Sequence, residues 1–169
     1  MKWMLREGVR MFNHDLRRDF LRATVLGCLM PLIPVRVALA AGEAEDRLTG
    51  DLRRAWELLA AGDQEATVKF VDHSLGTFQA EAQDQARAMT GFAAAGKELE
   101  FHKVNIAGTL HYIRALAFQR AGKRDEWLTA LRKVWTEYPF SRAWDPKGWF
   151  WKPGQAAKKE GYIFPAASR

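Results

Sequence analysis

Apolar side chains recur along residues 46–137 at the three- and four-residue spacing of an α-helix, and strand-like alternation is almost absent. The pattern predicts four helices. In the second, an apolar stripe runs for about seven turns from Val68 to Phe92, with Gly76 as the position where the helix can bend. The predicted ranges are 46–61, 63 to the Ala95-Gly96-Lys97 break, 99–120 and 124–137.

Glycines mark the ends of three of these helices. Gly62, Gly96 and Gly122 each follow an alanine at the end of an apolar stripe, where glycine readily supplies a left-handed cap. Asp63 is a predicted N-cap, and Pro139 stops the fourth helix. Because the turns are short, the helices should pack as antiparallel hairpins. We therefore expect an all-α domain over 41–139, followed by an irregular tail over 140–169.

The third and fourth helices share features with a 34-residue helical repeat that ends in proline. With Pro139 as that proline, small, aromatic and turn residues of the repeat fall on Gly108, Ala115, Phe118, Gly122 and Asp125-Glu126. Trp127 and Val134 replace small residues of the pattern, and the first two helices match it less well. The region resembles a tetratricopeptide repeat. That resemblance implies a right-handed helical repeat with a groove for a protein partner, and a plain four-helix bundle is the alternative.

The N-terminal 40 residues contain a basic, an apolar and a small-residue stretch in the order of a cleavable signal. The apolar stretch covers 23–35, and Ala38-Leu39-Ala40 would allow cleavage before Ala41. The basic stretch ends in a motif formed by Arg17, Arg18, Phe20, Leu21 and Arg22. This motif resembles the twin-arginine (Tat) signal of bacterial export. The resemblance implies a periplasmic protein that folds before it crosses the membrane.

Two other interpretations of this segment stay open. The position before the arginines is Leu16 rather than the usual serine or threonine, so an ordinary secretory signal is one alternative. A lipoprotein attached through Cys28 is the other. The apolar stretch is shorter than the roughly 20 residues that span a bilayer, so we do not expect a transmembrane anchor.

Composition limits what the exported part can do. The chain has 26 basic and 20 acidic residues, but removing residues 1–40 leaves 129 residues with 19 basic and 17 acidic. A net charge of +2 does not indicate nucleic-acid binding. Cys28 is the single cysteine and leaves with the signal, which excludes disulfides, thiolate metal ligands and thiol nucleophiles from the mature chain.

The tail is the most unusual part of the mature sequence, because six of the fourteen residues 138–151 are aromatic. Three uses are open: a cover for the last helix pair, a docking patch for a partner, or a foot in the membrane interface. Carbohydrate stacking is a fourth, weaker option. A turn is predicted at 145–148 and a short helix at 155–160. The predicted partner-binding residues are Arg142, Trp144, Lys147, Trp149, Phe150 and Trp151.

The sequence contains no catalytic motif, phosphate-binding loop or His-Glu-x-x-His pattern. A metal site from His73 and His111 with Glu98 or Glu100 is geometrically conceivable, but a surface or core position is favoured for each histidine, and we expect no cofactor. The favoured hypothesis is a non-enzymatic accessory protein that binds another exported protein, for example an oxidoreductase subunit without its own signal. The alternatives are a small metal- or cofactor-binding periplasmic protein and an envelope structural protein with a membrane-interfacial tail.

The export hypothesis yields a direct prediction. Replacing both Arg17 and Arg18 with lysine should leave the precursor in the cytoplasm, because the paired arginines are what identifies a Tat signal. Cell fractionation and immunoblotting of the tagged protein measure the outcome. An unchanged periplasmic fraction would contradict export in the folded state.

Overall fold

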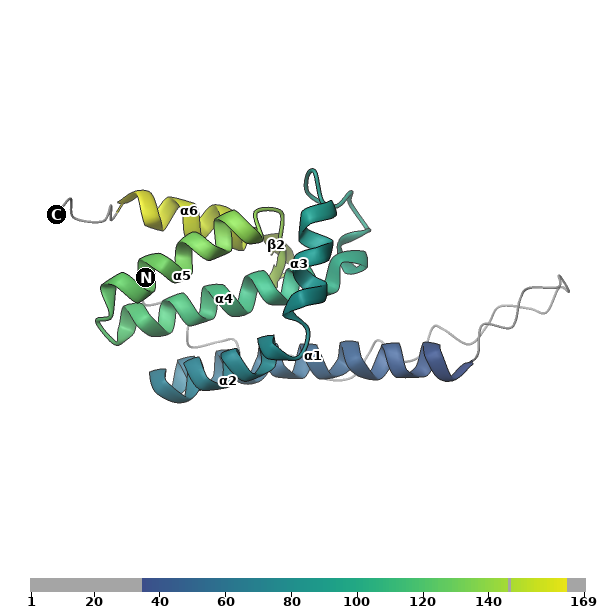
Figure 1. The fold of residues 1–169 in the computed structure, drawn as a ribbon, viewed down its shortest axis with the longest axis horizontal. Coiled ribbons are helices and arrows are strands. Elements are labelled where there is room, and N and C mark those ends of the chain that lie inside the picture. The colour runs from purple at the N-terminus through teal and green to yellow at the C-terminus, as the bar shows by residue number, and fades with distance from the viewer. Residues whose placement is uncertain (1–34, 146, 164–169) are drawn as a thin grey trace, which may run out of the picture. The chain divides into compact units, whose positions relative to one another are not determined.

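The computed structural model describes residues 35–145 and 147–163, and it shows helices joined by short turns with one small hairpin (Figure 1). The all-α class is confirmed, whereas the type of helical repeat stays a prediction. The elements are α1 Val35–Ala61, α2 Gln64–Gly76, α3 Gln79–Ala88, the 3₁₀ turn η1 Glu98–Phe101, α4 His102–Arg120, α5 Arg124–Glu137, β1 Ala143–Asp145, β2 Trp149–Trp151 and α6 Pro153–Ile163.

The chain divides into two compact units between residues 43 and 44. Of the first unit, only the helical backbone from Val35 to Glu43 is described, and it includes the predicted cleavage site at Ala38 and Ala40. The side chains of both alanines lie outside the described part, as does the whole motif Arg17, Arg18, Phe20, Leu21 and Arg22. Among the described helices, none is long and apolar enough to cross a membrane.

Helix boundaries in the second unit follow the predicted caps closely. Helix α1 ends at Ala61, and Gly62 takes a φ of +81°, a conformation that side chains with a Cβ rarely adopt. Asp63 then caps α2, since its Oδ1 accepts a hydrogen bond from the N–H of Ala66 at 2.9 Å. Gly122 separates α4 from α5 in the same left-handed conformation.

The prediction of one long second helix was wrong. Helix α2 ends at Gly76, and the Thr77 hydroxyl donates a hydrogen bond to the carbonyl of Ser74 at 2.8 Å, which satisfies a group at the helix end. Phe78 leaves the helical conformation with a φ of −147° and is buried in the core. Helix α3 ends at Ala88, so Phe92 lies in a loop instead of on the apolar stripe.

Helix α4 is the centre of the second unit, and α2, α3, α5 and α6 all pack on it. Eleven of its nineteen residues are buried, so it lacks the broad solvent-exposed face that a surface helix has. One apolar cluster joins α4 to α1, α2 and α3, and a second joins it to α5 and α6. Helix α1 is tied to α2 by a hydrogen bond from the Ser74 hydroxyl to Asp51 Oδ2 at 2.7 Å.

Gly108 permits the closest approach to α4. A Cβ at this position would lie 2.4 Å from the Oγ and 2.6 Å from the Cβ of Ser141, and 3.3 Å from the Cβ of Tyr138. Tyr138 is fully buried at the end of α5, and the Ser141 hydroxyl donates to its carbonyl at 2.9 Å. The absence of a side chain at Gly108 therefore lets the segment that leads into the C-terminal hairpin lie directly on α4.

Replacing Gly108 with alanine should therefore destabilise the fold by about 1–3 kcal/mol, because the new methyl group overlaps Ser141. Gly76→Ala is the matched control, since a Cβ there meets nothing within 4 Å and alanine favours the helix. Chemical denaturation of both variants measures the difference. Equal stability of the two variants would show that the packing at Gly108 is not as close as described.

Candidate interaction site on the C-terminal hairpin

The aromatic tail begins as a β-hairpin. Strands β1 and β2 are antiparallel, with Ala143 opposite Trp151, Trp144 opposite Phe150 and Asp145 opposite Trp149. The Gly148 N–H donates to the Asp145 carbonyl at 2.9 Å, and the φ of Gly148 is +93°. A three-residue hairpin loop commonly ends in such a left-handed residue. The turn was predicted, but the expectation of an irregular chain around it was wrong.

The Arg142 residue joins the base of the hairpin to the start of α4. Its N–H donates to Asn105 Oδ1 at 2.8 Å, and its guanidinium pairs with Glu98 Oε1 at 3.0 Å. Asn105 in turn donates to the Glu98 carbonyl at 2.7 Å. Both side chains of the ion pair are mostly buried, so the pair is shielded from solvent and holds a defined geometry. We define Glu98, Asn105 and Arg142 as the hairpin clasp.

Trp151 fixes the other strand from the opposite side. Its ring meets the ring of Tyr112 edge to face, with centroids 5.2 Å apart. The Tyr112 hydroxyl donates to Glu160 Oε1 on α6 at 2.5 Å. Burial and this hydrogen bond to a carboxylate raise the pKa of Tyr112, which keeps the phenol protonated as the donor. Trp151 therefore packs on α4 at a tyrosine that is itself hydrogen-bonded to α6.

Helix α6 was predicted as a short helix and is present as Pro153–Ile163. It packs on α5, where Gly161 lies against Trp135: a Cβ at Gly161 would lie 2.4 Å from the Trp135 ring. Helix α6 thus covers α4 and α5, whereas the cover interpretation of the tail had assigned that role to Trp144, Trp149 and Trp151, of which only Trp151 packs on the helices.

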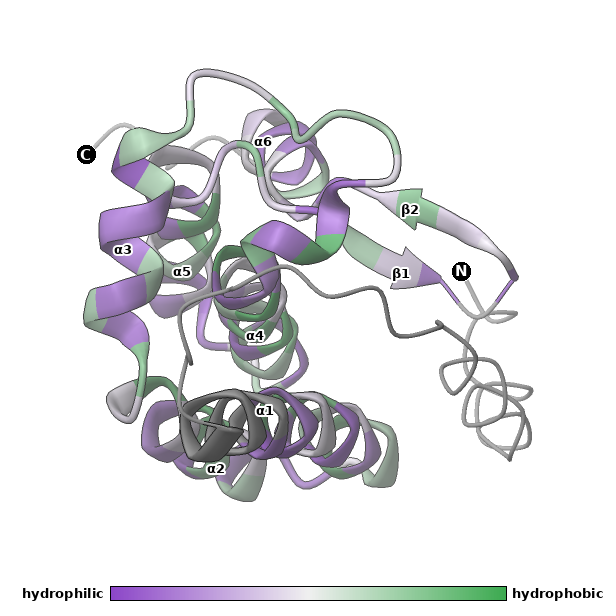
Figure 2. Cartoon of the chain, turned by 90° about the vertical axis from the view of Figure 1, so that its right-hand side faces the viewer, coloured by the Kyte–Doolittle hydropathy of each residue, from purple (hydrophilic) through white to green (hydrophobic). Residues whose placement is uncertain are grey.

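Two indoles of the hairpin stay exposed. Trp144 has 53% and Trp149 has 48% of its surface accessible, and Lys147 between them is exposed as well. The ring of Trp144 contacts the ring of Phe150 edge to face, with centroids 5.0 Å apart. In Figure 2 the two strands run outward from the helices and their turn lies at the outer end. We call Trp144, Lys147 and Trp149 the hairpin tip.

The six predicted partner-binding residues therefore lie on one hairpin but differ in their surroundings. Arg142 and Trp151 are bound within the fold, and Phe150 is half-buried beside Trp144. Only the three residues of the hairpin tip are exposed. The geometry divides the predicted set into anchors at the base and exposed residues at the tip.

Sequence reasoning missed the role of Phe92. Its ring meets Phe140 edge to face at 5.5 Å, and the Lys152 Nζ lies 4.5 Å from the ring centroid. The Arg142 guanidinium carbon lies 5.5 Å from the same centroid. These cation–π contacts attach the 89–97 loop to both ends of the hairpin. Phe92 fitted the helical period, so nothing in the local pattern pointed to this loop position.

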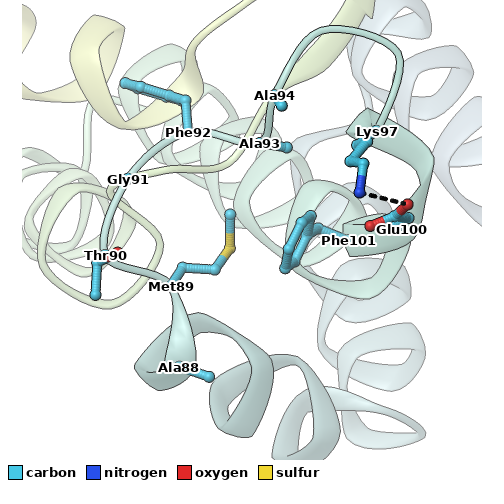
Figure 3. Close-up of a pocket in the computed structure, with 10 residues that line it drawn as sticks. All are labelled: Ala88, Met89, Thr90, Gly91, Phe92, Ala93, Ala94, Lys97, Glu100 and Phe101. Atoms are coloured by element: carbon cyan, nitrogen blue, oxygen red, sulfur yellow. Dashed lines mark ion pairs between the residues drawn. The ribbon is translucent and has the colours of Figure 1, made fainter.

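A hollow of about 390 Å³ lies beneath that loop (Figure 3). Met89 and Phe101 point into it, whereas Phe92 points away toward the tail. Its two titratable side chains, Lys97 and Glu100, pair with each other at 3.8 Å. The hollow offers apolar contact and a solvated ion pair, which suits packing or weak binding better than acid–base chemistry.

A smaller groove of about 270 Å³ lies between α4 and α5. Its two cations are already paired with carboxylates: Arg114 lies 3.0 Å from Asp72, and Lys133 lies 3.7 Å from Glu137. Arg114 also lies over the ring of Phe118, at 5.3 Å. The two cations of the groove are therefore engaged within the fold, and the other charged residues that line it are the carboxylates Asp125 and Glu126.

His111 is buried beside this groove and stacks on Tyr138 with ring centroids 5.3 Å apart. Burial, assisted by the positive charges of Lys133 and Arg114, lowers the pKa of His111 to about 3, so the imidazole is neutral at pH 7. Within the described ranges, no three histidine, aspartate or glutamate side chains come together as metal ligands, and His73, His111, Glu98 and Glu100 do not assemble.

Comparisons with family models, curated proteins and solved structures found no match for this chain.

Truncating Trp151 to alanine should destabilise the fold, whereas truncating Trp149 should leave its stability almost unchanged. Trp151→Ala removes the contact with Tyr112 and should cost about 2 kcal/mol of unfolding free energy. Trp149→Ala removes an exposed ring and should change stability by less than about 0.5 kcal/mol. Thermal and urea unfolding of the two variants check this. A large loss of stability in Trp149→Ala would mean that this indole belongs to the core.

Proposed function

We propose that this chain is an exported, non-catalytic accessory protein that binds another exported protein through the hairpin tip. The observation that carries the proposal is the display of two half-exposed indoles on a hairpin whose base is fastened to the core. Tryptophan is enriched among the residues that contribute most to protein interfaces. The exposed groups are indoles and an ammonium, which supply contact area and charge but no nucleophile.

The anchoring of the hairpin favours binding. Ordering a mobile side chain at an interface costs about 0.5–1.5 kcal/mol, and a rigid display reduces that cost. The hairpin clasp fixes β1 and the contact with Tyr112 fixes β2, so the backbone that carries Trp144 and Trp149 is already ordered. Exposed indoles without a binding function would instead favour aggregation.

The location of the partner follows from the export hypothesis. The resemblance to a twin-arginine signal suggests that this chain crosses the membrane folded, and a bound protein could cross with it. An oxidoreductase subunit that lacks its own signal is a suitable candidate, because a cofactor has to be inserted before export. In that arrangement the small chain would supply the signal and the docking surface.

The test compares a double variant, Trp144→Ala with Trp149→Ala, with Tyr162→Ala. Tyr162 is an exposed ring on α6, outside the hairpin. Mature protein is purified from the periplasm of the native host, and complexes are sized by chromatography with light scattering. The wild type and Tyr162→Ala should carry a stoichiometric partner. The double variant should lose it by at least about thirtyfold in affinity, which is the loss expected on removing one hot-spot residue of about 2 kcal/mol.

The proposal fails if the double variant keeps the partner as well as the wild type does. It also fails if all three proteins are free of a protein partner while the hairpin tip binds lipid. The second result would favour the envelope protein with an interfacial tail.

A further inference from the structure

The two indoles of the hairpin tip lie on opposite faces of the hairpin. Side chains alternate between the faces along a strand, so Trp144 and Asp145 point to opposite sides. Trp149 is directly opposite Asp145 and shares its face, whereas Trp144 shares its face with Phe150. A flat partner surface laid on one face would therefore cover only one of the two exposed indoles.

Charge at the tip adds a second constraint. The Asp145 carboxylate accepts the Lys147 N–H at 2.8 Å and is used within the turn. Lys147 is exposed at the outer end, whereas Lys152 lies over the ring of Phe92 at the base of the hairpin. Residues 139–169 contain six basic and two acidic residues. A partner that meets this end of the chain gains most if it presents carboxylates there.

We propose that the hairpin enters a cleft of its protein partner tip first, with both faces covered by apolar walls and a carboxylate of the partner meeting Lys147. This inference rests on the proposed function, because it requires a protein partner at the hairpin tip. About half of each indole is already buried, so covering the exposed half contributes about half of the 150–250 Å² that a whole aromatic side chain buries. Insertion uses the area of both rings, whereas docking on one face leaves one of them in water.

Because the base of the hairpin is held by the fold, the turn end is free to enter a partner. The hairpin clasp and the Tyr112–Trp151 contact both lie at the end of the strands away from the turn. Contacts of the fold and contacts of the partner therefore use different ends of the same short element. Covering the tip would not require the base to unpack.

The experiment places a photo-crosslinking amino acid at position 144, 149 or 162 of the full chain in its native host. Insertion predicts that positions 144 and 149 crosslink to the same protein with yields within about twofold of each other, while the control position 162 gives no such product. Lys147→Glu should reduce both yields by about fivefold or more, whereas Lys158→Glu, on α6, should not. Melting temperatures of the variants confirm that each is folded.

The outcomes distinguish insertion of the hairpin from the more general proposal of a protein partner at the hairpin tip. Crosslinking from only one of positions 144 and 149 would overturn insertion and leave the proposed function standing. Equal yields that are indifferent to Lys147→Glu would overturn the acidic cleft. A protein product at neither position would overturn both the insertion and the proposed function. Sedimentation of the purified mature chain with phosphatidylglycerol vesicles would then show whether the tip binds an anionic lipid surface instead.

Discussion

The amide side chain of Asn105 joins three segments on which the candidate site depends. Its oxygen accepts the Arg142 N–H at the base of the hairpin, and its nitrogen donates to the carbonyl of Glu98 in η1. Glu98 completes this network, because its carboxylate pairs with the Arg142 guanidinium. An asparagine amide is suited to this position because it offers a donor and an acceptor at once. Without that bridge, the start of β1 loses the hydrogen bond that ties it to α4.

Helix α4 explains why the bridge can be built there. Because it is buried on almost every side, the elements around it have little freedom to shift. Gly108 lets the chain after α5 lie against it, and Ser141 at that contact directly precedes Arg142. The path from the core to the hairpin is therefore continuous: α4, the 138–142 segment, and then β1. Stability of the helical body and display of the two indoles are consequences of the same packing.

Local chemistry made much of this fold predictable. Gly62 and Gly122 follow the ends of α1 and α4 and adopt a positive φ, and Asp63 caps the start of α2. These boundaries could therefore be inferred from the local sequence alone. The break after Gly76 could not, because Phe78 fits the helical period and leaves the helix only to pack in the core. Its position is decided by tertiary contacts, which a periodic pattern does not contain.

The candidate site was predictable in its residues but not in its construction. The density of aromatic residues singled out the tail, and the turn at 145–148 was recognisable from its proline and glycine. Strands of three residues are too short to show alternation, so the hairpin was missed. The division into anchors and tip depends on partners far away in the sequence, such as Tyr112 for Trp151 and Asn105 for Arg142.

The central claim is that the hairpin is a fastened part of the fold rather than a loose tail. Amide hydrogen exchange of the protein, compared between the wild type and Asn105→Ala, tests it most directly. The account predicts that hairpin amides in the wild type are protected, and that Asn105→Ala releases them while the amides of α4 stay slow. Fast exchange throughout 143–151 in the wild type, or no change on removing the Asn105 amide, would contradict it.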